Sequence, residues 1–225
     1  MNQPVKAYVS WVAAVGSVAI GAAVAQCQFS HPVRFPVFFA LAFVASMLKI
    51  RFPAVTGTFS CSCLFVVLGI AELDRTEAML IAIAAAAGQT LLNVRGRATL
   101  MQLVFNVAAL GISTSAASLI RSLAVAWGAN SLLALLSTAA VYYAVNVLIV
   151  SGALALLHAK NMERMWHAWI RWTTPAFIAA TAAAAGLFLT NPMFHWNASM
   201  LFVPAVVVFQ VWYRRLLATR FGIGR

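Results

Sequence analysis

The chain has 225 residues, of which 64% are hydrophobic and only 8% are charged, and its formal net charge is +11 at pH 7. A soluble domain carries about 25% charged residues, so this chain cannot cover a globular surface with polar side chains, which excludes a soluble protein. The Lys and Arg residues lie in short gaps between apolar stretches, a pattern that argues against a nucleic-acid partner. The composition predicts an integral membrane protein whose main partner is the lipid bilayer.

Eight apolar stretches follow one another along the chain. They cover residues 8–25, 33–48, 58–71, 76–92, 101–120, 131–157, 173–190 and 198–213. Each predicts a helix, because lipid offers no partner for unpaired backbone groups and the alternation of a barrel strand is missing. A full span needs roughly 20 residues, so the second and third stretches are short. We predict a single all-α domain over residues 1–225, a polytopic membrane bundle with about eight transmembrane segments.

The first stretch carries small residues at four-residue spacing, namely Ala13, Ser17, Gly21 and Ala25. Residues four apart share a helix face, and small side chains on that face let another helix approach closely. The approaching helix could belong to the same chain or to a second subunit of a homodimer. This small-residue stripe therefore predicts a helix-packing face or an oligomer seam, and the sequence leaves both open.

The region between the second and fourth stretches contains a proline turn, the pair Cys61 and Cys63, and a short apolar run. A structural zinc site needs four ligands, and the chain has no second pair of cysteines, so we expect no metal here. The two cysteines are small packing residues at a helix start. Because the apolar run after them is short, we expect any departure from a plain transmembrane span in this region.

The only acidic cluster of the chain comes next, with Glu72, Asp74 and Glu77 in a predicted external loop. Asp74 is placed to cap the next helix, and Glu77 falls in its first turn, where a carboxylate complements the helix dipole. We interpret the cluster as a solvated capping loop, with binding of a periplasmic cation as the alternative.

Uncharged polar residues recur at four-residue spacing in the later stretches. These are the ligand-binding candidates: Gln89, Asn93, Gln102, Asn106, Thr138, Tyr142 and Asn146. Such faces should point into the bundle, since lipid offers them no hydrogen-bond partner. They either tie helices together through interhelical hydrogen bonds or line a small-molecule pocket, and both interpretations stay open.

The longest polar gap is HAKNMERMWHAWIRW, over residues 158–172. Its methionine and tryptophan residues recur at three- and four-residue spacings among basic residues, which is typical of a short amphipathic segment on the inner membrane surface. An extension of the following helix with an aromatic belt is the simpler interpretation.

Eight crossings place both termini on one side of the membrane and divide the basic residues unevenly. One side holds Lys6, Lys49, Arg51, Arg95, Arg97, Lys160, Arg164, Arg171, Arg214, Arg215, Arg220 and Arg225, and the other holds Arg34, Arg75 and Arg121. The positive-inside rule makes the first side cytoplasmic. The three external arginines could hold an anion if they converge, because charge-assisted hydrogen bonds are strong.

The sequence contains no catalytic constellation such as a Ser/His/Asp grouping, a Walker loop or an HExxH motif. No carboxylate lies well inside a predicted span, whereas proton relays and ion-coupled pumps usually place one there. We therefore expect no enzymatic activity in this chain, and neither a cofactor nor a metal.

Several short motifs together carry a family resemblance. They are LKIRFPAVTGTFS at 48–60, AMLIAIAAAAGQ at 78–89, LVFNVAALGIS at 103–113, YYAVNVLIVSGAL at 142–154 and VWYRRLL at 211–217. In this order they resemble the multi-helix membrane sensor region at the N-terminus of bacterial GGDEF and HD-GYP signalling proteins. The resemblance implies a sensory module in the bacterial inner membrane, whose last helix would pass a signal to a cytoplasmic effector domain absent from this chain.

The resemblance also implies that the signal leaves through Tyr213, Arg214 and Arg215. A more distant likeness to the substrate-binding subunits of energy-coupling-factor vitamin transporters implies an alternative function, the binding or transport of a vitamin-like small molecule. A structural subunit of a larger membrane complex, joined through the small-residue stripe, is the third possibility.

Overall fold

The computed structural model describes residues 3–51, 58–92 and 99–194, together with 208, 212 and 215, and this part of the chain is almost entirely helical. Its helices are α1 (Gln3–Val24), α2 (Arg34–Met47), α3 (Ser62–Glu72), α4 (Arg75–Leu91), α5 (Leu100–Ala126), α6 (Ser131–Leu157) and α7 (Met162–Phe194). The strands β1 (Lys49–Arg51) and β2 (Thr58–Ser60) form an antiparallel hairpin between α2 and α3. The predicted all-α class is confirmed.

Four helices are long and apolar enough to cross a membrane: α1, α5, α6 and the Met162–Thr190 part of α7. Helices α2 and α3 are apolar but have only 14 and 11 residues. The predicted count of about eight spans is not supported, since an apolar run records burial in protein as readily as exposure to lipid. The eighth predicted stretch, 198–213, falls almost wholly outside the described residues.

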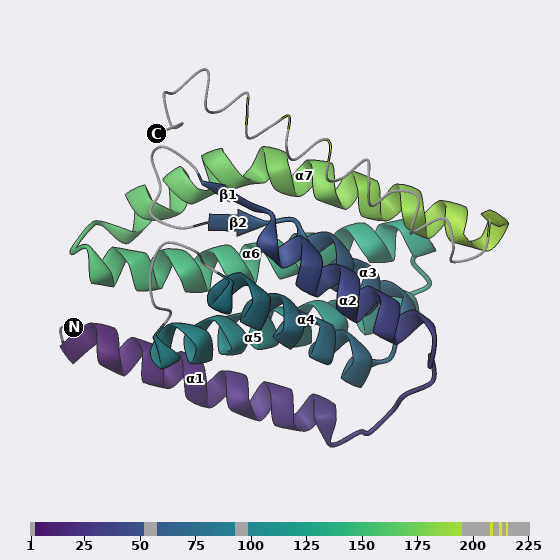
Figure 1. The fold of residues 1–225 in the computed structure, drawn as a ribbon, viewed down its shortest axis with the longest axis horizontal. Coiled ribbons are helices and arrows are strands. Elements are labelled where there is room, and N and C mark those ends of the chain that lie inside the picture. The colour runs from purple at the N-terminus through teal and green to yellow at the C-terminus, as the bar shows by residue number, and fades with distance from the viewer. Residues whose placement is uncertain are drawn as a thin grey trace.

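Successive helices run in opposite directions along the long axis of the molecule, so their connections gather at two ends (Figure 1). The hairpin end contains the start of α1, the β1–β2 hairpin and the α6–α7 connection. At the opposite end, the acidic end, the α1–α2 loop (residues 25–33) meets the turn between α3 and α4. Because of this alternation, the loops predicted to share one side of the membrane lie at the same end of the bundle.

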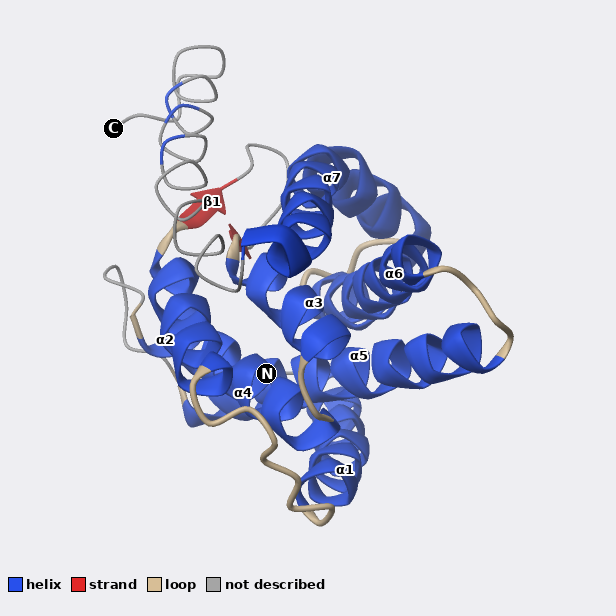
Figure 2. Cartoon of the chain, turned by 90° about the vertical axis from the view of Figure 1, so that its right-hand side faces the viewer, coloured by secondary structure: helices blue, strands red, loops and turns tan. Residues whose placement is uncertain are grey.

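Helix α3 lies at the centre of the bundle (Figure 2) and contacts α2, α4, α5, α6 and α7. Every residue from Ser62 to Ala71 is buried. At 1.5 Å per residue the helix is roughly 16 Å long, about half the hydrocarbon thickness of a bilayer. In the region where the sequence predicts any departure from a plain span, the structure therefore has a short helix enclosed by protein.

The β1–β2 hairpin leads the chain into this buried helix, and its register pairs Lys49 with Ser60. The Ser60 hydroxyl donates a hydrogen bond to the Ala45 carbonyl (3.0 Å) and accepts one from the Ser62 N–H (3.2 Å). The sequence predicts a helix from residue 58, but residues 58–60 form a strand. The reason is that the backbone pairs with β1 and Ser60 fixes the turn into α3.

Helix α1 packs on α5 at a glycine outside the predicted stripe. A Cβ at Gly16 would overlap the side chain and backbone of Ala108, so the close approach requires glycine at this position. Of the predicted stripe, Ala13 is half-buried and Ser17, Gly21 and Ala25 are exposed. A Cβ at Gly21 would have no neighbour within 4 Å. The internal contact therefore uses another face of α1, because Gly16 and not the stripe faces α5.

The segment predicted to lie on the inner membrane surface, residues 158–172, supplies the first turns of α7, which is one continuous helix from Met162. Met165 and Trp169 are buried against the core, whereas Met162 is 47% exposed. The simpler of the two interpretations, an extension of the following helix, describes this arrangement.

Candidate functional site

The predicted polar residues serve different purposes in the structure. Gln102 is exposed and forms a capping box at the start of α5, in which its N–H donates to Thr99 Oγ1 and its Oε1 accepts from the Thr99 N–H, both at 3.2 Å. Thr138 is buried and donates to the Ala134 carbonyl of its own helix. Asn93 lies outside the described residues. Gln102 and Thr138 are thus engaged in local contacts.

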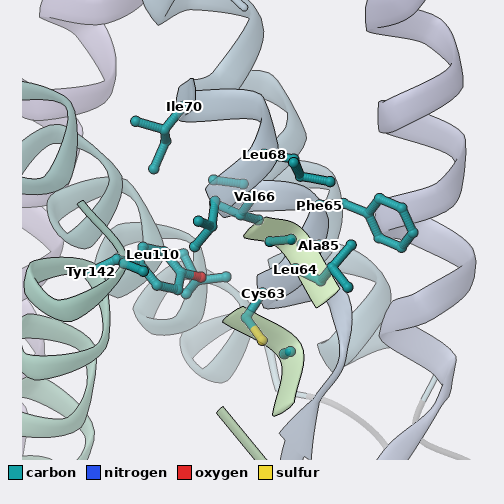
Figure 3. Close-up of a cluster of buried hydrophobic side chains, with 14 of the residues drawn as sticks. Cys63, Leu64, Phe65, Val66, Leu68, Ile70, Ala85, Leu110 and Tyr142 are labelled. Atoms are coloured by element: carbon teal, nitrogen blue, oxygen red, sulfur yellow. The ribbon is translucent and has the colours of Figure 1, made fainter. Parts of the chain in front are cut away.

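Asn106 joins two helices, since its Nδ2 donates a 2.8 Å hydrogen bond from α5 to Thr90 Oγ1 on α4. Tyr142 is 3% exposed and lies in the apolar core with Cys63 and Leu110 (Figure 3). The remaining candidates, Gln89 and Asn146, are half-buried. The hydrogen bond of Asn106 agrees with the interpretation that these polar faces tie helices together.

A polar contact that the sequence did not predict joins α6 to α7. The Tyr143 hydroxyl lies 2.7 Å from Thr173 Oγ1 and 2.8 Å from Thr174 Oγ1. The Tyr143 ring stacks on Phe177 with centroids 4.4 Å apart. Pro175 follows the two threonines and removes one backbone hydrogen bond from the helix. The contacts of Tyr143 with Thr173, Thr174 and Phe177, the Tyr143 clasp, therefore lie beside the proline of α7, and the Thr-Thr-Pro motif inside a long apolar helix is their sequence signal.

Asp74 and Glu77 of the acidic cluster form the start of α4, as predicted, whereas Glu72 is the last residue of α3. Asp74 is the N-cap and makes a capping box with Glu77, in which the Asp74 N–H donates to Glu77 Oε2 at 3.1 Å. The Ser30 N–H from the α1–α2 loop donates to Asp74 Oδ2 at 2.9 Å. Hydrogen bonding from Ser30 holds the pKa of Asp74 below its ordinary value of 3.8. The predicted cap is confirmed, and it also binds the neighbouring loop.

Glu77 is fully buried, so the prediction of a solvated loop is wrong for this residue. Its Oε1 accepts a 3.0 Å hydrogen bond from the His31 N–H, and its Oε2 lies 2.8 Å from His31 Nδ1. A carboxylate leaves water only where such partners replace its hydration. Thr76 Oγ1 extends the network by donating to the Ala23 carbonyl at 2.8 Å. These bonds dock the α1–α2 loop on the start of α4 and so cover Glu77.

The alternative interpretation of the acidic cluster was a cation site, and His31 together with two of the acids forms a possible set of cation ligands. His31, Asp74 and Glu77 offer ligand atoms that all lie within 4.8 Å of one another. One imidazole and two carboxylates suit a divalent transition metal. In this structure the carboxylates instead accept N–H groups, and the cluster is assembled as a loop-docking contact.

Two of the three arginines predicted to be external line a hollow of about 250 Å³ beside this cluster. Arg75 and Arg121 share it with Ser118, Ser122 and Asp74, and its lining also includes the apolar residues Ile70, Leu73 and Ala78. Arg121 also donates a hydrogen bond to the Ala71 carbonyl at the end of α3. Arg34 does not join them, because its guanidinium lies 3.9 Å from the Glu72 carboxylate. The structure thus brings two of the three arginines together.

A comparison with models of protein families finds a match over nearly the whole chain. The MASE9 family model matches residues 18–215, and MASE9 is a family of membrane-associated sensor domains. No curated protein and no solved structure matches the chain. The match agrees with the helical bundle and its four helices of spanning length. The chain belongs to the MASE9 family of membrane-associated sensor domains.

Proposed function

We propose that the chain is a multi-pass sensory module of the bacterial inner membrane, which passes the state of its external end to a cytoplasmic effector. Membership of the MASE9 family supports the sensory role. The motif resemblance to the sensor regions of GGDEF and HD-GYP proteins supports a cyclic-dinucleotide enzyme as the effector. In this proposal the chain itself catalyses nothing.

The proposed orientation places the hairpin end in the cytoplasm and the acidic end outside. Among the described residues, Lys6, Lys49, Arg51, Lys160 and Arg164 belong to elements of the hairpin end, and Arg34, Arg75 and Arg121 to those of the acidic end. The positive-inside rule favours this direction. Both termini then lie in the cytoplasm if residues 198–213 form a returning span.

The observation that carries the proposal is the enclosed helix α3. Its C-terminal end meets Arg121 through the Ala71 carbonyl and Arg34 through Glu72, both at the acidic end. Its other end follows the hairpin, and between them it contacts α7. Packed interiors move between discrete arrangements instead of deforming continuously. A ligand with different affinity for two arrangements of α3 would therefore shift the position of α7.

A fusion of the chain at Arg225 to a GGDEF reporter domain tests this proposal through the cyclic-dinucleotide level in cells. Tyr143→Phe removes the hydroxyl of the Tyr143 clasp and keeps the ring that stacks on Phe177, so we expect inserted protein with an altered output. Tyr8→Phe is the matched control, because it removes a 3.0 Å bond between α1 and the Ile149 carbonyl of α6 and takes no hydrogen bond from α7. An unchanged output from inserted Tyr143→Phe protein would contradict transmission through α7.

The alternative function, a vitamin-like binding or transport subunit, needs polar faces that enclose a ligand. Gln102 is engaged at a helix cap, Thr138 bonds within its own helix, and Asn106 bonds to Thr90. Side chains engaged in this way favour the sensory proposal over a central ligand pocket.

A further inference from the structure

We propose that the hollow between α3, α4 and α5 binds an oxyanion, a phosphate or carboxylate group presented from the external side. The inference rests on the proposed function and adds the chemical class of the ligand. The hollow measures about 250 Å³, and its polar lining includes Arg75 of α4 and Ser118, Arg121 and Ser122 of α5. Positions i, i+3 and i+4 share one helix face, so the three α5 side chains point to the same side.

The two guanidinium groups bring positive charge that is not paired with a carboxylate. The structure shows an ion pair of Arg34 with Glu72, but none for Arg75 or Arg121 within the residues that it covers. Arg121 is half-buried, and burying an unpaired charge is costly. The Ala71 carbonyl, at the C-terminal end of α3, supplies only a partial negative charge. An anion in the hollow would complete the neutralisation.

Asp74 is the acidic member of the lining, and it opposes this positive charge only in part. Its carboxylate is already engaged by the Ser30 N–H and by the capping box with Glu77. Two guanidinium groups therefore face one carboxylate that is already hydrogen-bonded. The start of α4 adds the positive end of a helix dipole. The lining is net positive, as a site for an anion requires.

The size and the lining of the hollow restrict the ligand. Pockets for drug-sized molecules usually measure about 300–1,000 Å³, so a volume near 250 Å³ suits one small polar group. Guanidinium groups bind phosphate and carboxylate through paired hydrogen bonds, and Leu119, 59% exposed at the rim, offers an apolar neighbour for the rest of the molecule. A water-soluble metabolite and a lipid headgroup both present this chemistry. A bound oxyanion would compete with the Ala71 carbonyl for Arg121 and so act on the end of α3.

The first experiment titrates inorganic phosphate into the full chain in maltoside micelles, with the unfolding temperature followed by tryptophan fluorescence. We expect a saturable rise for the wild type. Arg75→Gln should weaken the apparent affinity about tenfold or more, which corresponds to one charge-assisted hydrogen bond. Without phosphate it should unfold like the wild type, because Arg75 is exposed. Arg34→Gln is the matched control outside the hollow and should keep the wild-type affinity.

Arg121 needs a gentler substitution, because it also holds the Ala71 carbonyl. Arg121→Lys keeps the charge and a donor for that carbonyl but lacks the planar fork that binds an oxyanion through two bonds. We expect it to unfold close to the wild-type temperature without phosphate and to bind phosphate more weakly than Arg34→Gln does.

The second experiment records native mass spectra of the chain from micelles doped with phosphatidylglycerol. If Arg75→Gln retains less lipid than the wild type and Arg34→Gln retains as much, the site binds a lipid headgroup. A saturable response to phosphate in the first experiment assigns the site to a soluble anion. No response in either experiment, or equal responses from the two variants, would overturn the site. Both experiments measure binding without an effector, so a silent GGDEF reporter would count against the proposed function alone.

Discussion

At the residue scale, the docking of the α1–α2 loop depends on Glu77. This buried carboxylate accepts hydrogen bonds from the backbone N–H groups of His31 and Asp74 and also contacts the His31 ring. A buried donor that loses its partner costs about 1–3 kcal/mol, and Glu77 serves several donors at once. The sequence presents Glu77 as one of several acids in a loop, but in the structure it is a buried acceptor that holds the loop in place.

We expect Glu77→Ala to lower the free energy of unfolding by about 3 kcal/mol, because it leaves buried N–H groups without an acceptor. Chemical unfolding in micelles measures this change. Glu163→Ala is the control, since the Glu163 side chain is 76% exposed, and it should change stability by less than about 0.5 kcal/mol. Equal stability of the two variants would show that other contacts hold the loop.

Asp74 gives the docked loop a dependence on pH. Its pKa in the folded protein is lowered from 3.8, mainly by hydrogen bonding from Ser30, so its ionised form stabilises the fold above the unfolded value. This contribution is lost as the pH falls through the lowered pKa of the folded state. We expect the stability difference between the wild type and Asp74→Asn to be constant at neutral pH and to shrink below pH 3.8. A difference that grew on acidification would contradict this assignment.

At the scale of elements, the position of α1 is set by one close contact with α5. The space around Gly16 is filled by Ala108, whereas the space around Gly21, on the small-residue stripe, is open. A side chain at Gly16 would therefore clash with α5, whereas a side chain at Gly21 would have room. The difference follows from which face of α1 meets α5.

We expect Gly16→Leu to destabilise the bundle by about 1–3 kcal/mol or more, since the new side chain must push α1 away from α5. Thermal unfolding in micelles measures the effect. Gly21→Leu is the matched control on the same helix, and its unfolding temperature should stay within a few degrees of the wild type. A change of oligomeric state in Gly21→Leu, with stability kept, would identify the stripe as a subunit seam.

At the scale of the whole molecule, the two ends of the bundle differ in chemistry. Among the described elements, the hairpin end is basic, and the acidic end carries Asp74, Glu77 and His31. Cys27 is exposed at the acidic end, whereas Cys61 and Cys63 are buried beside the hairpin. The arrangement of the cysteines makes the proposed orientation measurable.

A membrane-impermeant maleimide should label Cys27 on spheroplasts, because the acidic end faces outward in the proposed orientation. The variant Cys27→Ser should stay unlabelled, since the other two cysteines are buried. Adding Lys160→Cys to that variant places a thiol in the exposed α6–α7 connection, and we expect it to react only after permeabilisation. The reverse pattern would invert the orientation and place the proposed anion site in the cytoplasm.

Parts of the site were predictable because they depend on local chemistry. The cap formed by Asp74 and Glu77 follows from residue types at the first turn of a helix, and the structure contains it. The convergence of Arg75 and Arg121 was not predictable, since they lie on different helices and meet only when α4 packs near α5. The burial of Glu77 likewise depends on a loop that comes from far earlier in the chain.

The sequence by itself determined that this is a helical membrane protein, because so few charges cannot cover a water-facing surface. It also located the irregular region around Cys61, since an apolar run of that length is too short to span a bilayer. Only the tertiary structure decided that α3 is enclosed by protein, that α1 meets α5 at Gly16, and that Tyr143 clasps α7. The physical reason is that hydropathy reports the removal of a side chain from water, whereas packing decides whether lipid or protein takes the place of that water.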